Sequence, residues 1–318
     1  NWTELTTSTT KPSGRSWHSS ILFDGQMVVF GGKVGHNSYK NDVWALDLKQ
    51  SPPVWNEITT AGTKPIARQY HSSILFDGQM VMFGGEDDVS NKNDVWTLNL
   101  TSYDWTQLTT SATKPNARER HSSILYDGQM VVFGGYDGSW KNDVWALDLN
   151  TNVWTEITTT STKSSPSRGY HTSILYNEKM IMFGGTDGSY KNDVWTLDLN
   201  TNTWTEVTTS DTKPSGRGYH SSILYNGQMV MFGGQDGSYN NDAWTLDLTS
   251  YAWTQLTTTG TKPSARHGHS SIVYNGQMVM FGGWDGSNKY NDVWTLDLTF
   301  PENYPFKAPT VTFRTEIK

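Results

Sequence analysis

The sequence predicts an all-β protein, a six-bladed β-propeller whose blades are four-stranded antiparallel sheets. Three observations predict it: a pattern of about fifty residues occurs six times, each copy reads as four short strands, and the chain opens with a strand that its last copy lacks. The copies begin at histidines spaced 53, 50, 50, 49 and 49 residues apart: His18, His71, His121, His171, His220 and His269. Such units are typical of propeller blades.

Each copy opens with a predicted β-hairpin, as the third copy illustrates. Residues 121–135 read HSSILYDGQMVVFGG, two apolar runs on either side of Asp127-Gly128. Asp-Gly in this setting predicts a type I′ turn, because both central residues of that turn have positive φ. The other copies carry Asp-Gly or Asn-Gly here, except for Asn177-Glu178, which we expect to be the least favourable hairpin. The double glycine indicates close approach of another backbone.

The second half of each copy predicts two more strands. In the third copy a polar loop at residues 137–139 precedes a strand over residues 144–147, and a polar turn at residues 150–152 precedes a strand over residues 153–159. The chain starts with NWTELTT, which matches a fourth strand, and the sixth copy departs from the pattern after its third strand. We therefore expect residues 1–7 to complete blade six, which removes open sheet edges.

Composition excludes several function classes. The 318-residue chain has a net charge of -7, which provides no basic surface for nucleic acid or anionic lipid. Without cysteine it has no disulfide, thiolate metal ligand or thiol nucleophile. No apolar stretch reaches the length of a membrane span, and the first residues do not resemble a signal peptide. We expect a cytoplasmic monomer without membrane or nucleic-acid partners and without a cofactor.

Polar residues recur at fixed places in every copy. An Arg precedes each of the six histidines by three positions, and an Asn-Asp pair opens each third strand. Because a catalytic or metal site is a single asymmetric constellation, we interpret the repeated residues as structural, with an Arg fork meeting an Asp carboxylate as a brace between blades. The third-strand tryptophans are interpreted as wedges between blades. The predicted structural network consists of Arg15, Arg68, Arg118, Arg168, Arg217, Arg266, Asp42, Asp94, Asp143, Asp193, Asp242 and Asp292.

The double glycine, the later Trp and the Arg-x-x-His before the first strand resemble kelch repeats in their Arg-His variant, over residues 1 to about 298. The resemblance implies a six-bladed kelch propeller, in most cases a protein-binding platform. In some kelch propellers the equivalent arginines face the central mouth and grip acidic peptides, which requires them to be unpaired. An enzyme of the galactose-oxidase type, also a kelch propeller, needs a Cys crosslinked to a copper-ligating Tyr, and this chain has no Cys. We expect no enzyme activity of this chain, and the question stays open for a longer parent protein that carries a further domain.

The last nineteen residues depart from the repeat, so we divide the chain into a propeller at residues 1–299 and a tail at residues 300–318. The tail, FPENYPFKAPTVTFRTEIK, resembles the FPxxYPFxxPxVxFxTxI segment of ubiquitin-conjugating enzymes. That family's His-Pro-Asn motif and active-site Cys are absent, so no conjugating activity is implied for this chain. A cut within a larger fusion, insertion of the propeller into a conjugating domain, a recombination scar and an unrelated Pro-rich tail remain as explanations.

Function is predicted where the copies differ. The residues two positions after each Arg, those directly after the double glycine, and the aromatic residues between the second and third strands are expected to share one face. Tyr, Trp and Arg exposed there are typical of binding hot spots, and the alternative is that the rings only cap loops. The predicted partner-binding residues are Trp17, Tyr70, Arg120, Tyr170, Tyr219, Tyr136, Trp284, Trp140, Tyr39, Tyr190 and Tyr239.

These observations predict a non-catalytic platform for a protein or peptide. It would recruit partners for a fused ubiquitin-conjugating unit if the tail belongs to one. The alternative is a carbohydrate or small-molecule binder, since aromatic rings beside Asp and Asn also suit sugars.

Overall fold

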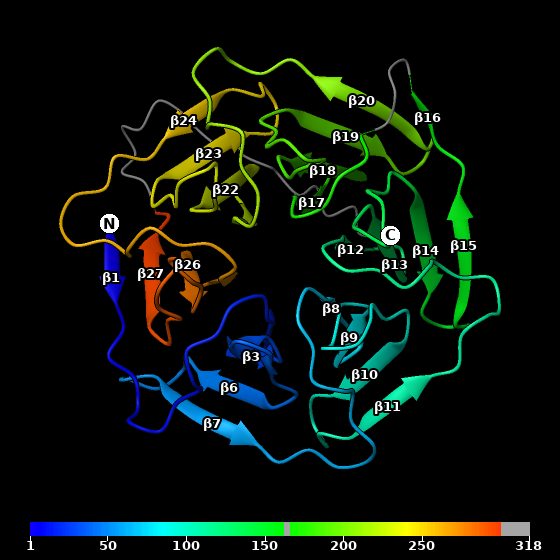
Figure 1. Cartoon of the computed structure of the whole chain (residues 1–318). Helices are drawn as coiled ribbons and strands as arrows, with labels where there is room; N and C mark the ends of the chain where they lie inside the picture. Colours follow the sequence, from blue (N-terminus) through cyan, green and yellow to red (C-terminus); the bar gives the residue numbers. More distant parts are fainter. Residues whose placement is uncertain (162–165, 300–318) are drawn as a thin grey trace, which may run out of the picture.

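Six sheets surround a central axis in the computed structural model, which describes residues 1–161 and 166–299 (Figure 1). Each sheet has four antiparallel strands that run outward from the axis in chain order, apart from the sheet that joins the two ends, and the fourth sheet has a fifth, parallel strand of two residues at its outer edge. The predicted six-bladed propeller is therefore confirmed. Within the described ranges no helix is long and apolar enough to cross a membrane. The tail predicted at residues 300–318 lies outside the described residues.

The blades are similar in strand length and order. Five of them are built from consecutive strands, listed from the axis outward: β2 (Ser19–Phe23), β3 (Gln26–Phe30), β6 (Val43–Asp47), β7 (Val54–Ile58); β8 (Ser72–Phe76), β9 (Gln79–Phe83), β10 (Val95–Asn99), β11 (Trp105–Leu108); β12 (Ser122–Tyr126), β13 (Gln129–Phe133), β14 (Val144–Asp148), β15 (Val153–Ile157); β17 (Thr172–Tyr176), β18 (Lys179–Phe183), β19 (Val194–Asp198), β20 (Thr203–Val207); and β21 (Ser221–Tyr225), β22 (Gln228–Phe232), β23 (Ala243–Asp247), β24 (Trp253–Gln255). Short additional strands are β4 (Lys33–Gly35), β5 (Ser38–Tyr39) and β16 (Thr160–Ser161).

The sixth blade joins the two ends of the described chain. It consists of β25 (Ser270–Tyr274), β26 (Gln277–Phe281) and β27 (Val293–Asp297), followed outward by β1 (Trp2–Glu4). β1 pairs antiparallel with β27, placing Trp2 opposite Leu296 and Glu4 opposite Trp294. The expected closure by the N-terminal strand is therefore confirmed, with a strand of three residues.

The hairpin turns have the backbone that the Asp-Gly pairs predict. Asp127 and Gly128 both have positive φ, 46° and 71°, as a type I′ turn requires. Asn177 and Glu178 take the same conformation, with φ of 46° and 61°. Because a Cβ crowds the backbone in this region, Glu178 is strained where the other copies carry glycine.

The core lies between blades, where each sheet face packs against the next. Between blades three and four, Phe133 and Trp204 are fully buried with ring centroids 4.8 Å apart, and Trp195 belongs to the same cluster. Equivalent clusters occupy all six interfaces. The third-strand tryptophans therefore lie between blades, as predicted, and burial of these rings supplies much of the driving force for folding.

The double glycine is required by two close approaches. A Cβ on Gly134 would lie 2.7 Å from the Arg168 carbonyl oxygen of the next blade. A Cβ on Gly135 would lie 2.6 Å from the Glu119 carbonyl oxygen of its own blade. Both glycines have positive φ, so the close backbone approach predicted for this pair is confirmed.

Candidate functional site

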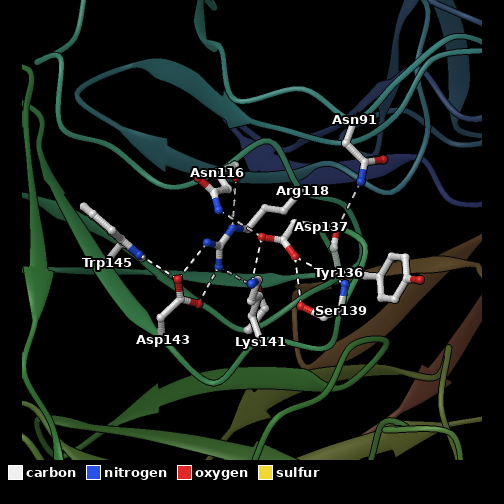
Figure 2. A network of polar contacts seen from close by, with 10 residues as sticks. Asn91, Asn116, Arg118, Tyr136, Asp137, Ser139, Lys141, Asp143 and Trp145 are labelled. Carbon is white, nitrogen blue, oxygen red and sulfur yellow. Dashed lines mark hydrogen bonds and ion pairs between the residues drawn. The ribbon is translucent and has the colours of Figure 1, made fainter.

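The repeated arginines are buried and each holds an Asp carboxylate, as Arg118 illustrates (Figure 2). Its two terminal nitrogens donate to both oxygens of Asp143 at 2.6 and 2.7 Å, and Nη1 also donates to the Gly134 carbonyl at 2.9 Å. The Trp145 indole N–H donates to the same carboxylate at 2.8 Å. The pKa of Asp143 is lowered, because the Arg118 hydrogen bonds and charge outweigh an opposing effect of burial.

All six copies form this fork, and it braces one blade rather than two. The expected Arg to Asp pairing is present, but a contact between blades was the wrong expectation, because both residues flank strands of the same sheet. The ion pairs join Arg15 to Asp42, Arg68 to Asp94, Arg118 to Asp143, Arg168 to Asp193, Arg217 to Asp242 and Arg266 to Asp292. With side chains at most 4% exposed, these guanidiniums are not available to grip an acidic peptide.

The six repeated histidines brace neighbouring blades. The His121 ring lies 5.1 Å from Phe83 of the preceding blade, and the His171 Nε2 meets the Ser122 hydroxyl of the preceding blade at 2.8 Å. Burial, followed by the charge of Arg118, lowers the pKa of His121 to about 3, so its imidazole is neutral at physiological pH. Among the described residues no group of three or more His, Cys, Asp or Glu side chains is placed to hold a metal ion.

The variable segments gather on one face, as the sequence predicts. The residue after each Arg forms an antiparallel bridge with the residue after the double glycine, for example Glu119 with Tyr136. In five blades that second residue also bridges to the loop before the third strand, as Tyr136 does to Trp140, and in blade one Lys33 pairs with Tyr39 between β4 and β5. We call the surface formed by these segments the loop face.

On the axis of the loop face, six backbones form a closed ring of hydrogen bonds. Each N–H donates to the carbonyl of the equivalent residue in the preceding blade, at 2.7 to 3.1 Å. All six residues have φ between 57° and 67°, a conformation that bulky residues rarely adopt. The members are Trp17, Tyr70, Arg120, Tyr170, Tyr219 and Gly268.

Five of the predicted partner-binding residues meet at this axis and pack on one another. The Tyr170 and Tyr219 rings are 3.7 Å apart, and the Arg120 guanidinium lies 4.7 Å from the Tyr170 ring and 5.2 Å from the Tyr70 ring. Trp17 lies 4.9 Å from Tyr70. The side chains are half-buried and border a cavity of about 130 Å³ on the axis. These five side chains therefore occupy the axis of the loop face and leave only this small cavity there.

Three predicted loop residues cover the neighbouring blade. Trp140 lies over Gly169 and Tyr190 lies over Gly218, since a Cβ on either glycine would approach the ring to 2.8 and 3.6 Å. Tyr239 lies 5.1 Å from His267 in the same way. Trp284 packs against that histidine at 5.4 Å. These four rings therefore pack against other residues of the loop face.

The remaining two predicted residues, Tyr39 and Tyr136, border an open groove. It has a volume of about 530 Å³ and is formed by residues 37, 39, 86–91, 119 and 136–138 of blades one to three. Asn91 occupies the position held by Trp140, Tyr190 and Tyr239 in blades three to five, and its Nδ2 donates to the Tyr136 carbonyl at 3.2 Å (Figure 2). The groove is open here because a small amide replaces an aromatic ring.

The groove is acidic, and its floor was not predicted from the sequence. Glu119 is only 3% exposed. Burial and the nearby Glu86 raise its pKa to about 8, against the lowering effect of the Arg120 charge. Gln69 donates to Glu86 from the same position of the previous blade. The residue directly after each Arg also differs among copies, and that variation was the available signal.

An all-β ring of six blades, with one buried Arg–Asp fork in each blade and with variable loops on one face, defines a kelch-type propeller. The family model described as the KLHDC2/KLHL20/DRC7 Kelch-repeats domain matches residues 1–185 and 170–310. The chain belongs to this family.

Individual relatives match shorter stretches. The chain is similar to the leucine-zipper-like transcriptional regulator 1 homolog of Drosophila melanogaster, with 32% identity over 107 residues that cover 32% of this chain and 11% of the relative. It is similar to the putative adagio-like protein 2 of Oryza sativa subsp. japonica, with 40% identity over 96 residues that cover 28% of this chain and 15% of the relative. The matches thus span a small part of each relative.

A solved structure matches nearly the whole chain. The structure of YjhT aligns with a TM-score of 0.72 and 16% identity, covering 90% of this chain and 96% of that one. At this identity the likeness shows the fold alone.

Proposed function

We propose that the loop face is a non-catalytic platform for a protein or peptide partner. The observation that carries the proposal is the groove of about 530 Å³ between the loops of blades one to three. The scaffold repeats in every blade, whereas the groove combines side chains that come together at no other place in the part of the chain that the structure describes. Its half-buried Tyr39 and Tyr136 rings and its carboxylates offer the apolar and polar contacts that peptide recognition uses.

A peptide selected from a random display library against the immobilised chain tests the proposal. We expect selected peptides to bind Tyr39→Ala and Tyr136→Ala about tenfold more weakly than the parent protein, since each change removes an aromatic wall of the groove. Val153→Ser is the matched control, because Val153 is an exposed apolar residue, 46% accessible, on the outermost strand of blade three. Equal weakening by all three variants, or by none, would contradict a partner site on the loop face.

A carbohydrate is the second candidate, favoured by aromatic rings that share the groove with Asp and Asn side chains. If a glycan-array signal is lost in Tyr136→Ala or Trp284→Ala and kept in Val153→Ser, the ligand of the loop face is a sugar rather than a peptide. The array and the display library use the same variants, so the two ligand classes are compared directly.

We extend the proposal to the segment at residues 300–318, which resembles part of a ubiquitin-conjugating enzyme. In this hypothesis the loop face delivers its partner to a conjugating unit encoded with the propeller. The coding sequence after Lys318 tests it: a His-Pro-Asn motif followed by a Cys is the expected result, and a stop codon would refute it.

A further inference from the structure

The lining of the groove carries charge of one sign. Five of its twelve lining residues are acidic, namely Glu86, Asp87, Asp88, Glu119 and Asp137, and none is Lys, Arg or His. The pKa of Tyr39 at the rim is raised by partial burial and by four of these carboxylates. The groove therefore has a negative potential that low-dielectric walls strengthen.

Two of the five carboxylates are neutralised by lysines of their own loops. Asp87 pairs with Lys92 at 2.6 Å, and Asp137 pairs with Lys141 at 2.9 Å. By contrast, Glu86 and Asp88 form no ion pair with any residue that the structure describes. The groove thus retains negative charge that its own surroundings do not balance.

Glu119 is the feature that distinguishes this groove from a solvated acidic surface. It is 97% buried, its Oε1 lies 3.0 Å from Arg120 Nη2, and its Oε2 meets no donor within the described part of the chain. A buried carboxyl in this setting costs free energy unless it is protonated or meets a donor, and the protonated Glu119 shares a hydrogen bond with Glu86 that helps to raise its pKa. A cationic donor from a partner fits the surrounding charge and can take the place of the proton that the two carboxyl groups share.

We infer that the groove binds the cationic side chain of a lysine or arginine in a peptide partner, an inference that rests on the proposed function of the loop face. The ammonium or guanidinium group donates to Glu119 Oε2 and Glu86, and Asp88 lies at the entrance. The rings of Tyr39 and Tyr136 also border the groove, and each already faces a cation of this chain, Lys33 at 5.4 Å from the Tyr39 ring and Arg120 at 5.4 Å from the Tyr136 ring.

Binding of a cation in this place displaces a proton. The pKa of Glu119 is raised to about 8, so the free protein carries this carboxyl largely protonated at pH 7, and a bound cation favours the ionised form. We therefore expect the affinity for an arginine peptide to rise as the pH is raised from about 6.5 to 9, because arginine stays charged throughout this range.

The test uses capped, fluorescently labelled tetra-arginine, tetralysine and tetraglutamate peptides, with binding measured by anisotropy. We expect the two cationic peptides to bind and tetraglutamate not to bind. Glu119→Gln and Asp88→Asn should each weaken the binding of tetra-arginine about tenfold, the loss typical of one charge-assisted contact. The pH dependence should be absent in Glu119→Gln. Glu86→Gln provides a second variant of the floor, should Glu119→Gln unfold.

Asp236→Asn is the matched control, because it removes one negative charge that has no ion-pair partner among the described residues from the corresponding loop of blade five on the same face. If this control loses as much affinity as Asp88→Asn, the overall charge of the protein explains the binding of the cationic peptides, and the inference is overturned. Unchanged affinity in the Glu119 and Glu86 variants would overturn it as well. Peptides from the display library that need Tyr136 but not Glu119 would refute the cationic partner while leaving the proposed function in place.

Discussion

Closure of the ring by β1 allows a matched pair of substitutions to measure how firmly the ends are joined. Trp2 in β1 and Trp154 in β15 hold the same place in their blades, opposite Leu296 and Leu147. They are 6% and 3% exposed. Their rings lie 4.6 Å from Phe232 and 5.0 Å from Phe83.

Truncation of either indole removes a large buried side chain from an interface between blades. Trp→Ala in a core costs about 3–5 kcal/mol of the free energy of unfolding. If β1 closes the ring as a full member of its blade, Trp2→Ala and Trp154→Ala should destabilise the protein to the same extent, within about 1 kcal/mol. Both residues have nearly equal burial and ring contacts.

Urea unfolding followed by circular dichroism measures both free energies. A loss below about 1 kcal/mol for Trp2→Ala, beside a full loss for Trp154→Ala, would refute closure by a stably paired β1. Deletion of residues 1–7 is the coarser version of the same test, because it exposes the edge of β27. An unchanged melting temperature of that truncation would contradict the pairing of β1 with β27.

Three further outcomes follow from the scaffold. Glu178→Gly should raise the free energy of unfolding by about 1 kcal/mol in urea titration, because glycine takes the positive φ of this turn without strain; a loss of stability would contradict this. Arg118→Lys should lower the free energy of unfolding by about 3 kcal/mol, because lysine cannot hold both Asp143 oxygens, and a loss near zero would argue against the fork as a brace. The pKa of His121 is lowered from 6.5 to about 3, chiefly by burial, so the stability this residue contributes above pH 6.5 is lost as the pH falls towards 3. His121→Gln should therefore have a shallower decline of unfolding free energy between pH 6 and 4, by about 1.4 kcal/mol per pH unit, and equal slopes in the two proteins would count against a buried neutral imidazole.

The fold was predictable because each blade repeats the same local signals. The Asp127-Gly128 turn, the alternation of the flanking strands and the fifty-residue spacing all indicate four-stranded blades, and β1 was recognisable from its likeness to the fourth strands. Even the exception at Asn177-Glu178 was readable, since the turn type alone demands positive φ at both positions.

The candidate site was only partly predictable, because it depends on neighbours from different blades. Tyr39 and Tyr136 were identified from differences among the copies and do border the groove. Glu119 was missed, because its burial and its place beside Glu86 of the neighbouring blade depend on contacts between blades. A comparison of the six copies with one another does not reveal which loop lies over which neighbouring blade.

The axis of the loop face has a consequence for how repeat copies diverge. Six large side chains cannot meet at one point, and the structure resolves this by omission: a Cβ on Gly268 would lie 2.6 Å from the Trp17 ring, which occupies the vacant place. Six identical large side chains are therefore unattainable at the centre of this molecule. Where most copies carry a large residue at this position, at least one copy has to carry a small one even when nothing binds there, so a difference among the copies at the axis can reflect a shortage of space.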